Sequence, residues 1–154
     1  MTKRTIKILS LSLVLVGVMI AVPAFAVKPN GPSAVNGLAQ DSHLYLYEKD
    51  PSTWEVVEGG AWGKMRYNPE SFVFNGHGLM PKTGYTLLRY NDEWPVVQCL
   101  ASGESNKGGN LHLSGEMLNG GPKVWLVLSS DVDCDNSAMI AWTPANYLFE
   151  YDLI

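Results

Sequence analysis

The stretch Phe72–Tyr90, FVFNGHGLMPKTGYTLLRY, decides the fold class. It holds two short apolar segments, Phe72–Asn75 and Tyr85–Tyr90, separated by a cluster of Gly, Asn and Pro. Short apolar runs rich in aromatic residues and bounded by such residues predict strands joined by turns, because Gly, Asn and Pro favour turn conformations. The chain from Asp41 onward repeats this pattern and shows no sustained helical period. We therefore expect an all-β domain.

Nine segments of the chain, including the two in this stretch, are short apolar runs bounded by turn-forming residues. A spacing of about 8 to 12 residues between such segments is typical of antiparallel sandwiches and barrels, and here it predicts an antiparallel β-sandwich of about seven to nine strands. Val124–Leu128 is apolar at every position, which leaves two alternatives: a central strand covered on both faces, or a strand covered by another molecule. The candidate strands are His43–Glu48, Thr53–Val57, Trp62–Tyr67, Phe72–Asn75, Tyr85–Tyr90, Val96–Ala101, Leu111–Ser114, Val124–Ser129 and Asn146–Tyr151.

Residues 79–87, LMPKTGYTL, have the spacing L-x-P-x-T-x-Y-x-L. This motif resembles the tyrosine corner of fibronectin type III and other immunoglobulin-like sandwiches. The resemblance implies that the Tyr85 hydroxyl reaches back to the backbone just upstream, that Leu79 is a core residue and that Pro81 sets the turn. It favours an immunoglobulin-like sandwich and says nothing about function, because such folds host many activities.

The first 26 residues have the three parts of a secretory signal peptide. Lys3, Arg4 and Lys7 form a basic segment, an apolar run follows from Ile8 to Val22, and Ala24-Phe25-Ala26 is a cleavage motif. The alternative is an anchor helix that is not cleaved. Residues 27–40, rich in Pro, Gly and Asn, are predicted to form a flexible arm, and residues 41–154 the folded domain. No membrane span is expected after cleavage.

The net charge limits the expected binding partners, and the cysteines bear on the cellular compartment. The formal net charge is -4, with 11 Lys and Arg against 15 Asp and Glu, and removal of three basic residues with the signal segment makes it -7. Nucleic acid is therefore not an expected partner, because its binding requires a basic surface. Cys99 and Cys134 are the two cysteines of an exported chain, so we expect a disulfide. Two buried free thiols are the alternative.

The segment Asp131-Val132-Asp133-Cys134-Asp135-Asn136 is the sharpest candidate for a metal site. Carboxylates at alternate positions of a loop can converge on a hard cation, which makes Asp131, Asp133, Asp135 and Asn136 candidate calcium ligands. An EF-hand is excluded, because Asn136 replaces the loop glycine and Trp142 stands where the bidentate Glu belongs. A solvated acidic turn is the alternative, and we expect no other cofactor.

No motif predicts catalytic residues. His43, His77 and His112 are isolated in the sequence, and nucleophile-elbow, zinc-ligand and phosphate-loop motifs are absent from it. The five Trp and seven Tyr could supply flat faces that stack on sugars or proteins, or could fill the core. Trp125, inside an apolar strand, is expected in the core. The candidates for a binding or assembly surface are Trp94, Tyr45, Tyr47, Tyr147 and Tyr151.

A looser resemblance covers Gly59–Asn68, Lys123–Asp135 and residues 146–154, NYLFEYDLI. These segments look like those of small secreted envelope proteins of methanogenic archaea, some of which build sheaths or surface layers. The resemblance implies a non-enzymatic protein of the extracellular surface or envelope that assembles with itself or with other surface components. The alternative is an extracellular binding module for carbohydrate or protein, with calcium as a possible requirement; a small secreted hydrolase is the third hypothesis.

Overall fold

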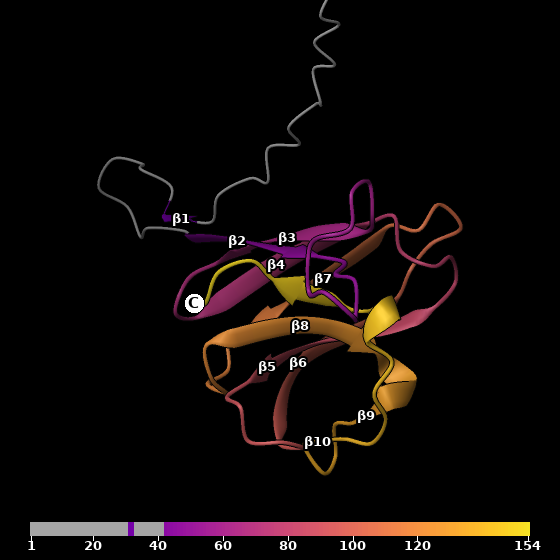
Figure 1. The fold of residues 1–154 in the computed structure, drawn as a ribbon. Helices are drawn as coiled ribbons and strands as arrows, with labels where there is room; N and C mark the ends of the chain where they lie inside the picture. Colours follow the sequence, from indigo (N-terminus) through magenta and orange to yellow (C-terminus); the bar gives the residue numbers. More distant parts are fainter. Residues whose placement is uncertain (1–30, 33–41) are drawn as a thin grey trace, which may run out of the picture.

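The fold is seen in a computed structural model, which describes residues 31–32 and 42–154. The predicted signal segment and most of the predicted arm lie outside the described residues. The described chain is built from antiparallel strands and two short 3-10 turns (Figure 1), which confirms the all-β prediction. The strands are β1 (Gly31–Pro32), β2 (Ser42–Tyr47), β3 (Trp62–Tyr67), β4 (Ser71–His77), β5 (Gly84–Tyr90), β6 (Val97–Glu104), β7 (Leu111–Glu116), β8 (Lys123–Leu128), β9 (Val132–Asp133), β10 (Ala138–Met139) and β11 (Leu148–Glu150); the turns are η1 (Ser129–Asp131) and η2 (Pro144–Asn146).

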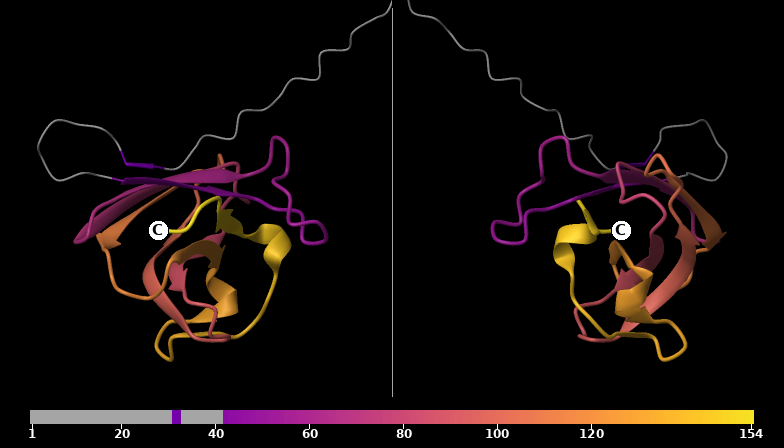
Figure 2. Two further views of the ribbon diagram at one scale, coloured as in Figure 1. Left: turned by 60° about the vertical axis from the view of Figure 1, so that its left-hand side comes forward. Right: turned by 90° about the vertical axis from the view of Figure 1, so that its right-hand side faces the viewer.

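One antiparallel sheet runs in the order β6-β5-β8-β11-β2-β3-β4-β7 and is nearly closed, because β6 and β7 at its two ends pack against each other. Two layers result, with β2, β3, β4 and β7 above β5, β6 and β8, and β11 joins them at one side (Figures 1 and 2). The predicted sandwich-like packing is thus achieved by two halves of a single curved sheet. No helix among the described residues is long and apolar enough to cross a membrane.

The first core fills the space between the two layers. Alternate residues of each strand point inward, since side chains of a strand alternate between its faces. Gly63 on β3 is required there, because a Cβ at this position would overlap the ring of Phe74 on β4. The inward residues include Leu44, Leu46, Met65, Phe72, Phe74, Leu87, Val124, Leu126 and Leu148.

A second core lies on the outer face of β5, β8 and β11. It is covered by residues 129–147, a segment that contains η1, β9, β10 and η2 and that we call the strap. Trp125 and Val127 of β8 point into this core, whereas Val124 and Leu126 point into the first. The apolar strand Val124–Leu128 is therefore central and covered on both faces within the chain. The second core contains Leu88, Tyr90, Val97, Trp125, Val127, Val132, Met139, Tyr147 and Phe149.

Covalent and polar contacts hold the strap in place. The predicted disulfide is present and joins Cys99 of β6 to Cys134 of the strap. Tyr147, which is fully buried, donates a hydrogen bond from its hydroxyl to the Asp131 carboxylate and accepts one from the Thr143 N–H at 3.0 Å. The carbonyl of Asp131 accepts the N–H of Ile140 at 2.9 Å. The strap is thus tied at both its beginning and its end.

The turn before β5 has the contacts that the L-x-P-x-T-x-Y-x-L motif predicts. Tyr85 is 1% exposed, and its hydroxyl accepts a hydrogen bond at 3.3 Å from the N–H of Met80, five residues upstream. Leu79 is buried in the first core. The Thr83 hydroxyl donates to the carbonyl of Pro81 at 3.1 Å. The tyrosine therefore fixes the path of the chain as it crosses from β4 to β5.

One predicted strand is absent, and another is shorter than predicted. Thr53–Val57 is a loop in which only Val56 pairs, with Lys49, because the Asp50 carboxylate accepts the N–H groups of Ser52 and Thr53 and so stabilises a turn. Trp54 in this loop has a φ of 61°, which a strand does not allow. The sequence Asn146–Tyr151 also begins in η2, so its strand is confined to β11.

Other segments pair more extensively than predicted. Gly76 and His77 continue β4 beyond the predicted end at Asn75 and pair with β3, and the left-handed turn starts only at Gly78, with a φ of 71°. Gly31 and Pro32, inside the predicted flexible arm, pair with β2. This half of β2 has a free edge for them, because β11 pairs only with Leu46 and Tyr47.

Candidate binding surface

Three exposed tryptophans from three separate loops meet on the outside of the second core. We call Trp54, Trp94 and Trp142 the tryptophan platform. Their exposed fractions are 49%, 52% and 42%. The ring centroids of Trp94 and Trp142 are 5.5 Å apart at an interplanar angle of 86°, and those of Trp54 and Trp142 are 6.5 Å apart at 35°. Large exposed apolar side chains gathered in this way mark a surface that binds a ligand or a partner.

The platform rests on buried aromatic rings. Trp142, in the strap, packs on Trp125 with a centroid distance of 5.7 Å and on Tyr147 at 5.4 Å. Trp54 packs edge-on against Phe149 at 5.2 Å. These contacts hold the rings of Trp54 and Trp142 on a packed base, so little conformational freedom remains for a ligand to remove.

Trp94 is positioned by the loop that leads into β6. The Trp94–Pro95 peptide bond is cis. The Pro95 carbonyl accepts the N–H of Met139 at 2.8 Å, and Val96 pairs with Ala138. Trp94 is therefore anchored to the strap beside Trp142.

The platform borders an open depression of about 440 Å³, which Tyr90, Asp92, Lys123 and Trp125 also line. The Lys123 ammonium group forms an ion pair with Asp92 and lies 5.8 Å from the centroid of the Tyr90 ring. Flat apolar surface beside a few hydrogen-bonding groups is the usual composition of a small-molecule or glycan subsite.

Asp131 and Asp133, two of the predicted calcium ligands, have different hydrogen-bond partners. The Asp131 carboxylate faces inward; burial raises its pKa, but hydrogen bonds from Tyr147, Thr143 and Ser130 outweigh this effect and leave the pKa below its usual value. Asp133 accepts hydrogen bonds from the Asn136 side chain and backbone, which lower the pKa of Asp133. Asp135 is exposed. Between Ser42 and Ile154 no group of three or more His, Cys, Asp or Glu is arranged to hold a metal ion. Calcium binding stays a prediction.

The histidines lie on the outer face of the upper layer. His77 stacks on Trp62 with a centroid distance of 4.7 Å and shares a hydrogen bond of 2.9 Å with Asn110. His112 shares one of the same length with Asn75. His43 lines a different depression, described below.

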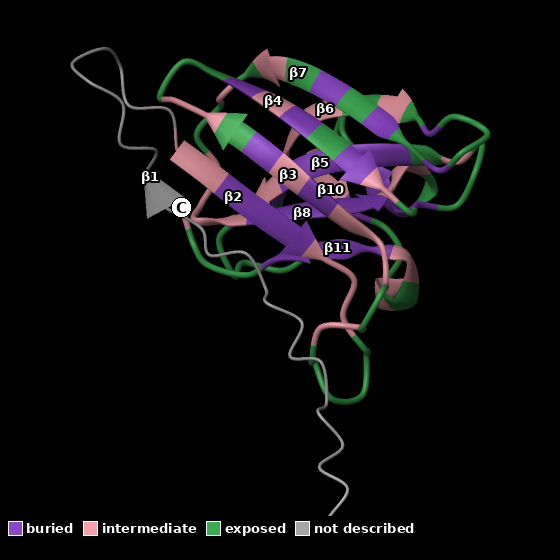
Figure 3. Cartoon of the chain, turned by 90° about the horizontal axis from the view of Figure 1, so that it is seen from above, coloured by how far each residue is buried: buried purple, intermediate pink, exposed green. Residues whose placement is uncertain are grey.

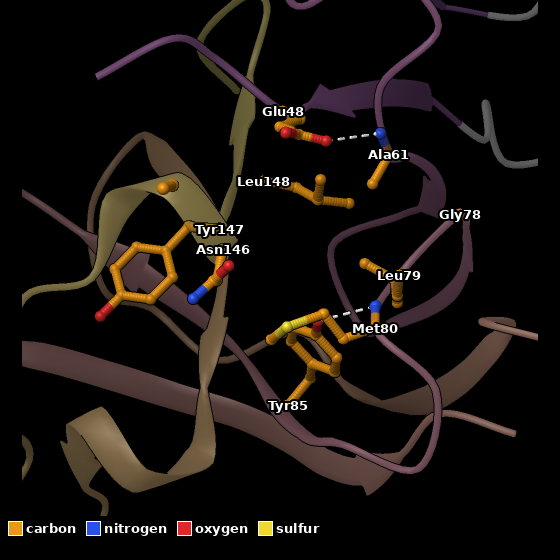
Figure 4. Close-up of a pocket in the computed structure, with 10 residues that line it drawn as sticks. Glu48, Ala61, Gly78, Leu79, Met80, Tyr85, Asn146, Tyr147 and Leu148 are labelled. Atoms are coloured by element: carbon orange, nitrogen blue, oxygen red, sulfur yellow. Dashed lines mark hydrogen bonds between the residues drawn. The ribbon is translucent and has the colours of Figure 1, made fainter. Parts of the chain in front are cut away.

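A small cavity opens at one end of the sheet, beside the tyrosine corner (Figure 4). Glu48, Tyr85 and Asn146 line it, and the Glu48 carboxylate accepts the N–H of Ala61 at 2.8 Å. Its volume of about 110 Å³ is below the roughly 300 Å³ at which ligand pockets begin. Its lining includes one carboxylate and no histidine, so this cavity does not join His77 or His112 to a carboxylate, as a hydrolase site built on these histidines requires.

The candidate surface residues separate into three sets. Trp94 belongs to the platform, whereas Tyr147 is buried beneath it. Tyr45, Tyr47 and Tyr151 form a second aromatic group, which we call the tyrosine patch: the rings of Tyr45 and Tyr47 are stacked at 6.4 Å, and Tyr151 packs edge-on against Tyr47 at 6.3 Å. Tyr45 is buried, with the Lys64 ammonium group 5.7 Å from its ring centroid, so Tyr47 and Tyr151 form the exposed part of the patch. Sequence reasoning did not separate Trp54 and Trp142 from core tryptophans. The signal lies in their neighbours, since DPSTW and WTP place both beside turn-forming residues.

Comparison of the chain with protein-family models, with curated protein sequences and with solved structures found no match.

Proposed function

We propose that this protein is an exported, non-catalytic module of the cell surface that binds carbohydrate through the tryptophan platform. The observation that carries the proposal is the meeting of Trp54, Trp94 and Trp142, each about half exposed, on a rigid aromatic base. Export is supported by the signal-like residues 1–26 and by the disulfide, which persists in oxidising compartments.

Sugar rings suit this surface better than a fully apolar ligand does. A tryptophan face offers a flat apolar area at low entropic cost, against which the C–H face of a sugar can pack. The neighbouring Asp92 carboxylate can accept hydrogen bonds from hydroxyl groups, and Lys123 can donate to them. A shallow, open depression also admits a chain that continues past it on both sides.

Affinity electrophoresis in gels that contain neutral or acidic polysaccharides tests the proposal. The wild-type protein is expected to be retarded by at least one glucan, galactan, chitin-derived or uronate polymer. Trp54→Ala and Trp94→Ala should each weaken the retardation at least tenfold. Tyr151→Ala removes an aromatic ring that is 51% exposed outside the platform, and it should leave binding unchanged. Unaltered binding by both tryptophan variants would overturn the proposal, as would the absence of any retarding polymer.

Self-association is a second candidate, and the tyrosine patch favours it. Tyr151 is 51% exposed beside Tyr47, close to where the chain leaves β11. Aromatic residues are enriched at protein interfaces because they give a large contact area per side chain. The strand Val124–Leu128 no longer supports assembly, since it is covered internally.

A further inference from the structure

A depression of about 310 Å³ on the outer face of the upper layer gathers basic and amide groups. It is lined by His43 of β2, Lys64 and Arg66 of β3, and Val73 and Asn75 of β4. Figure 3 shows this face, seen from above. Lys64 and Arg66 are two residues apart on one strand, so both side chains emerge on the same face with Cα atoms about 7 Å apart. We call this face, with its depression, the basic face.

The charge of the basic face is opposite to that of the protein. Residues 42–154 contain seven Lys and Arg and fourteen Asp and Glu. The outward positions of the described strands β2, β3, β4 and β7 carry two basic side chains, Lys64 and Arg66. These described positions carry one carboxylate, that of Glu116 at the end of β7. The Debye length is about 8 Å at physiological ionic strength, so acidic groups on other faces are screened from this one.

Hydrogen-bond donors accompany the charges. The side-chain oxygen of Asn75 can only accept, so His112 donates from Nδ1 across their contact of 2.9 Å. Asn75 is thereby held with its amide N–H groups as donors at the edge of the depression. Arg66 brings a planar guanidinium group, whose fork of N–H groups matches the two oxygens of a carboxylate.

Aromatic side chains connect the basic face to the tryptophan platform. Trp54 of the platform packs on Phe149, and Phe149 is the cross-strand partner of Tyr47. Tyr47 is in turn the partner of Trp62. Phe149 is 3% exposed beneath the platform, whereas Tyr47 and Trp62 are partly exposed, so the accessible part of this row spans β2 and β3. The row ends next to Lys64, two residues along β3 from Trp62.

We propose that the basic face binds the acidic groups of an anionic polysaccharide, so that the ligand of this protein is a charged glycan chain. This inference rests on the proposed carbohydrate-binding function and names the class of its ligand. Charge complementarity selects a polyanion, and the adjoining aromatic row selects one that has sugar rings. An acidic polypeptide offers the same charge without those rings.

Binding to polygalacturonate and to its fully methyl-esterified form separates charge from backbone, because the two polymers share the same sugar. The wild-type protein should bind the acid at least tenfold more tightly than the ester, and 0.5 M NaCl should abolish the difference. Alginate and dextran sulfate extend the test to other backbones and to sulfate groups. Equal affinity for acid and ester, or no binding to any acidic polymer, would overturn the inference.

Variants of Lys64 and Arg66 test whether the preference for the acidic polymer arises at the basic face. Lys64→Gln combined with Arg66→Gln should remove at least nine-tenths of the preference for the acid, whereas Lys82→Gln combined with Lys107→Gln makes the same charge change at exposed positions elsewhere and should preserve it. Lys64→Arg combined with Arg66→Lys retains the charge and should also preserve it. Thermal unfolding monitors the fold of each variant. Loss of the preference in the matched control would contradict a localised site.

The outcomes distinguish this inference from the proposed function. If the protein binds neutral polymers through the platform but shows no preference for the acid, the inference fails and the proposed function stands. If Trp54→Ala and Trp94→Ala leave all binding intact while the Lys64 and Arg66 variant abolishes it, the platform proposal fails instead. Polyglutamate bound as tightly as polygalacturonate would overturn the choice of a glycan as the occupant.

Discussion

Glu150 is a buried acidic residue near the end of the chain. Its side chain is 8% exposed at the end of β11, and Oε2 has no hydrogen-bond partner. Burial raises the pKa of Glu150 to about 7, although the peptide N–H groups of Glu150 and Val124 and the charges on Lys49 and Lys123 act in the opposite direction. The carboxyl group is therefore held largely protonated below neutral pH.

This residue predicts a loss of stability as the pH rises. The folded pKa of about 7 lies above the ordinary value of 4.5, so the folded state holds the proton more tightly than the unfolded state does. The contribution is fully present below pH 4.5 and is lost as the pH rises through 7, by up to about 3 kcal/mol. Urea unfolding between pH 4 and pH 8 should show this loss in the wild type and a smaller one in Glu150→Gln.

Glu93→Gln serves as the control for the pH measurement, since Glu93 is exposed in the loop before β6. Its pH dependence should follow that of the wild type. Identical pH profiles for the wild type and Glu150→Gln would show that the buried carboxyl group does not titrate in this range.

At the scale of elements, short polar contacts decide where strands begin and end. The segment Thr53–Val57 has the composition of a strand, but the Asp50 carboxylate stabilises a turn there and Trp54 is turned outward onto the platform. The strap likewise contains only two two-residue strands, and it is held by the disulfide and by the hydrogen bond from Tyr147 to Asp131. A loop and a strap thus supply two of the three tryptophans of the platform.

The tyrosine corner is the element contact best suited to a mutational test. Tyr85→Phe removes the acceptor of the Met80 N–H while it leaves the buried ring in place, and we expect a loss of about 1 to 3 kcal/mol of unfolding free energy. Tyr151→Phe, at an exposed position, should change it by less than about 0.5 kcal/mol. Chemical denaturation of both variants measures the difference, and equal small effects would mean that the corner bond contributes nothing.

At the scale of the whole molecule, the chain combines an acidic charge with two aromatic surfaces. The tryptophan platform is the proposed site for sugar rings, and the basic face the proposed site for acidic groups. The tyrosine patch lies beside the row of aromatic residues between them, since Tyr47 belongs to both. Polysaccharide binding and association between copies are therefore separable by variants on different surfaces.

The assembly hypothesis predicts oligomers whose size in sedimentation velocity grows with protein concentration. Calcium should enhance their formation, because a divalent cation relieves the repulsion between acidic chains. A charge introduced by Tyr151→Glu, at a position that is 51% exposed, should suppress the oligomers and leave the monomer folded. Glu93→Gln provides a control outside the patch. A strictly monomeric species at all concentrations, with and without calcium, would contradict the hypothesis and leave the carbohydrate-binding proposal in place.

Two kinds of feature could be predicted from the amino-acid sequence. They are features that follow from a local residue pattern and features for which few pairings are possible. The alternation of apolar and turn-forming residues predicted the all-β class and most strands, because side-chain burial has a period of two in a strand. Two cysteines permit a single pairing, and that pairing is present. The Tyr85 hydroxyl and the Met80 N–H that donates to it are five residues apart, within the range of a motif.

The exposed surfaces follow from contacts between segments that are distant in the sequence. Trp54, Trp94 and Trp142 come from loops up to 88 residues apart in the sequence. The residues around each of them do not indicate that the three side chains lie together in the fold. Near-closure of the sheet and the cover of β8 by the strap likewise depend on contacts between distant segments. The three aspartates of Asp131–Asn136 show that residues close in the sequence can have different surroundings. The Asp131 carboxylate accepts a hydrogen bond from the buried Tyr147 hydroxyl and therefore points inward, away from the other two. Local composition specifies which groups are available, whereas the packing of distant strands determines which of them come within bonding distance.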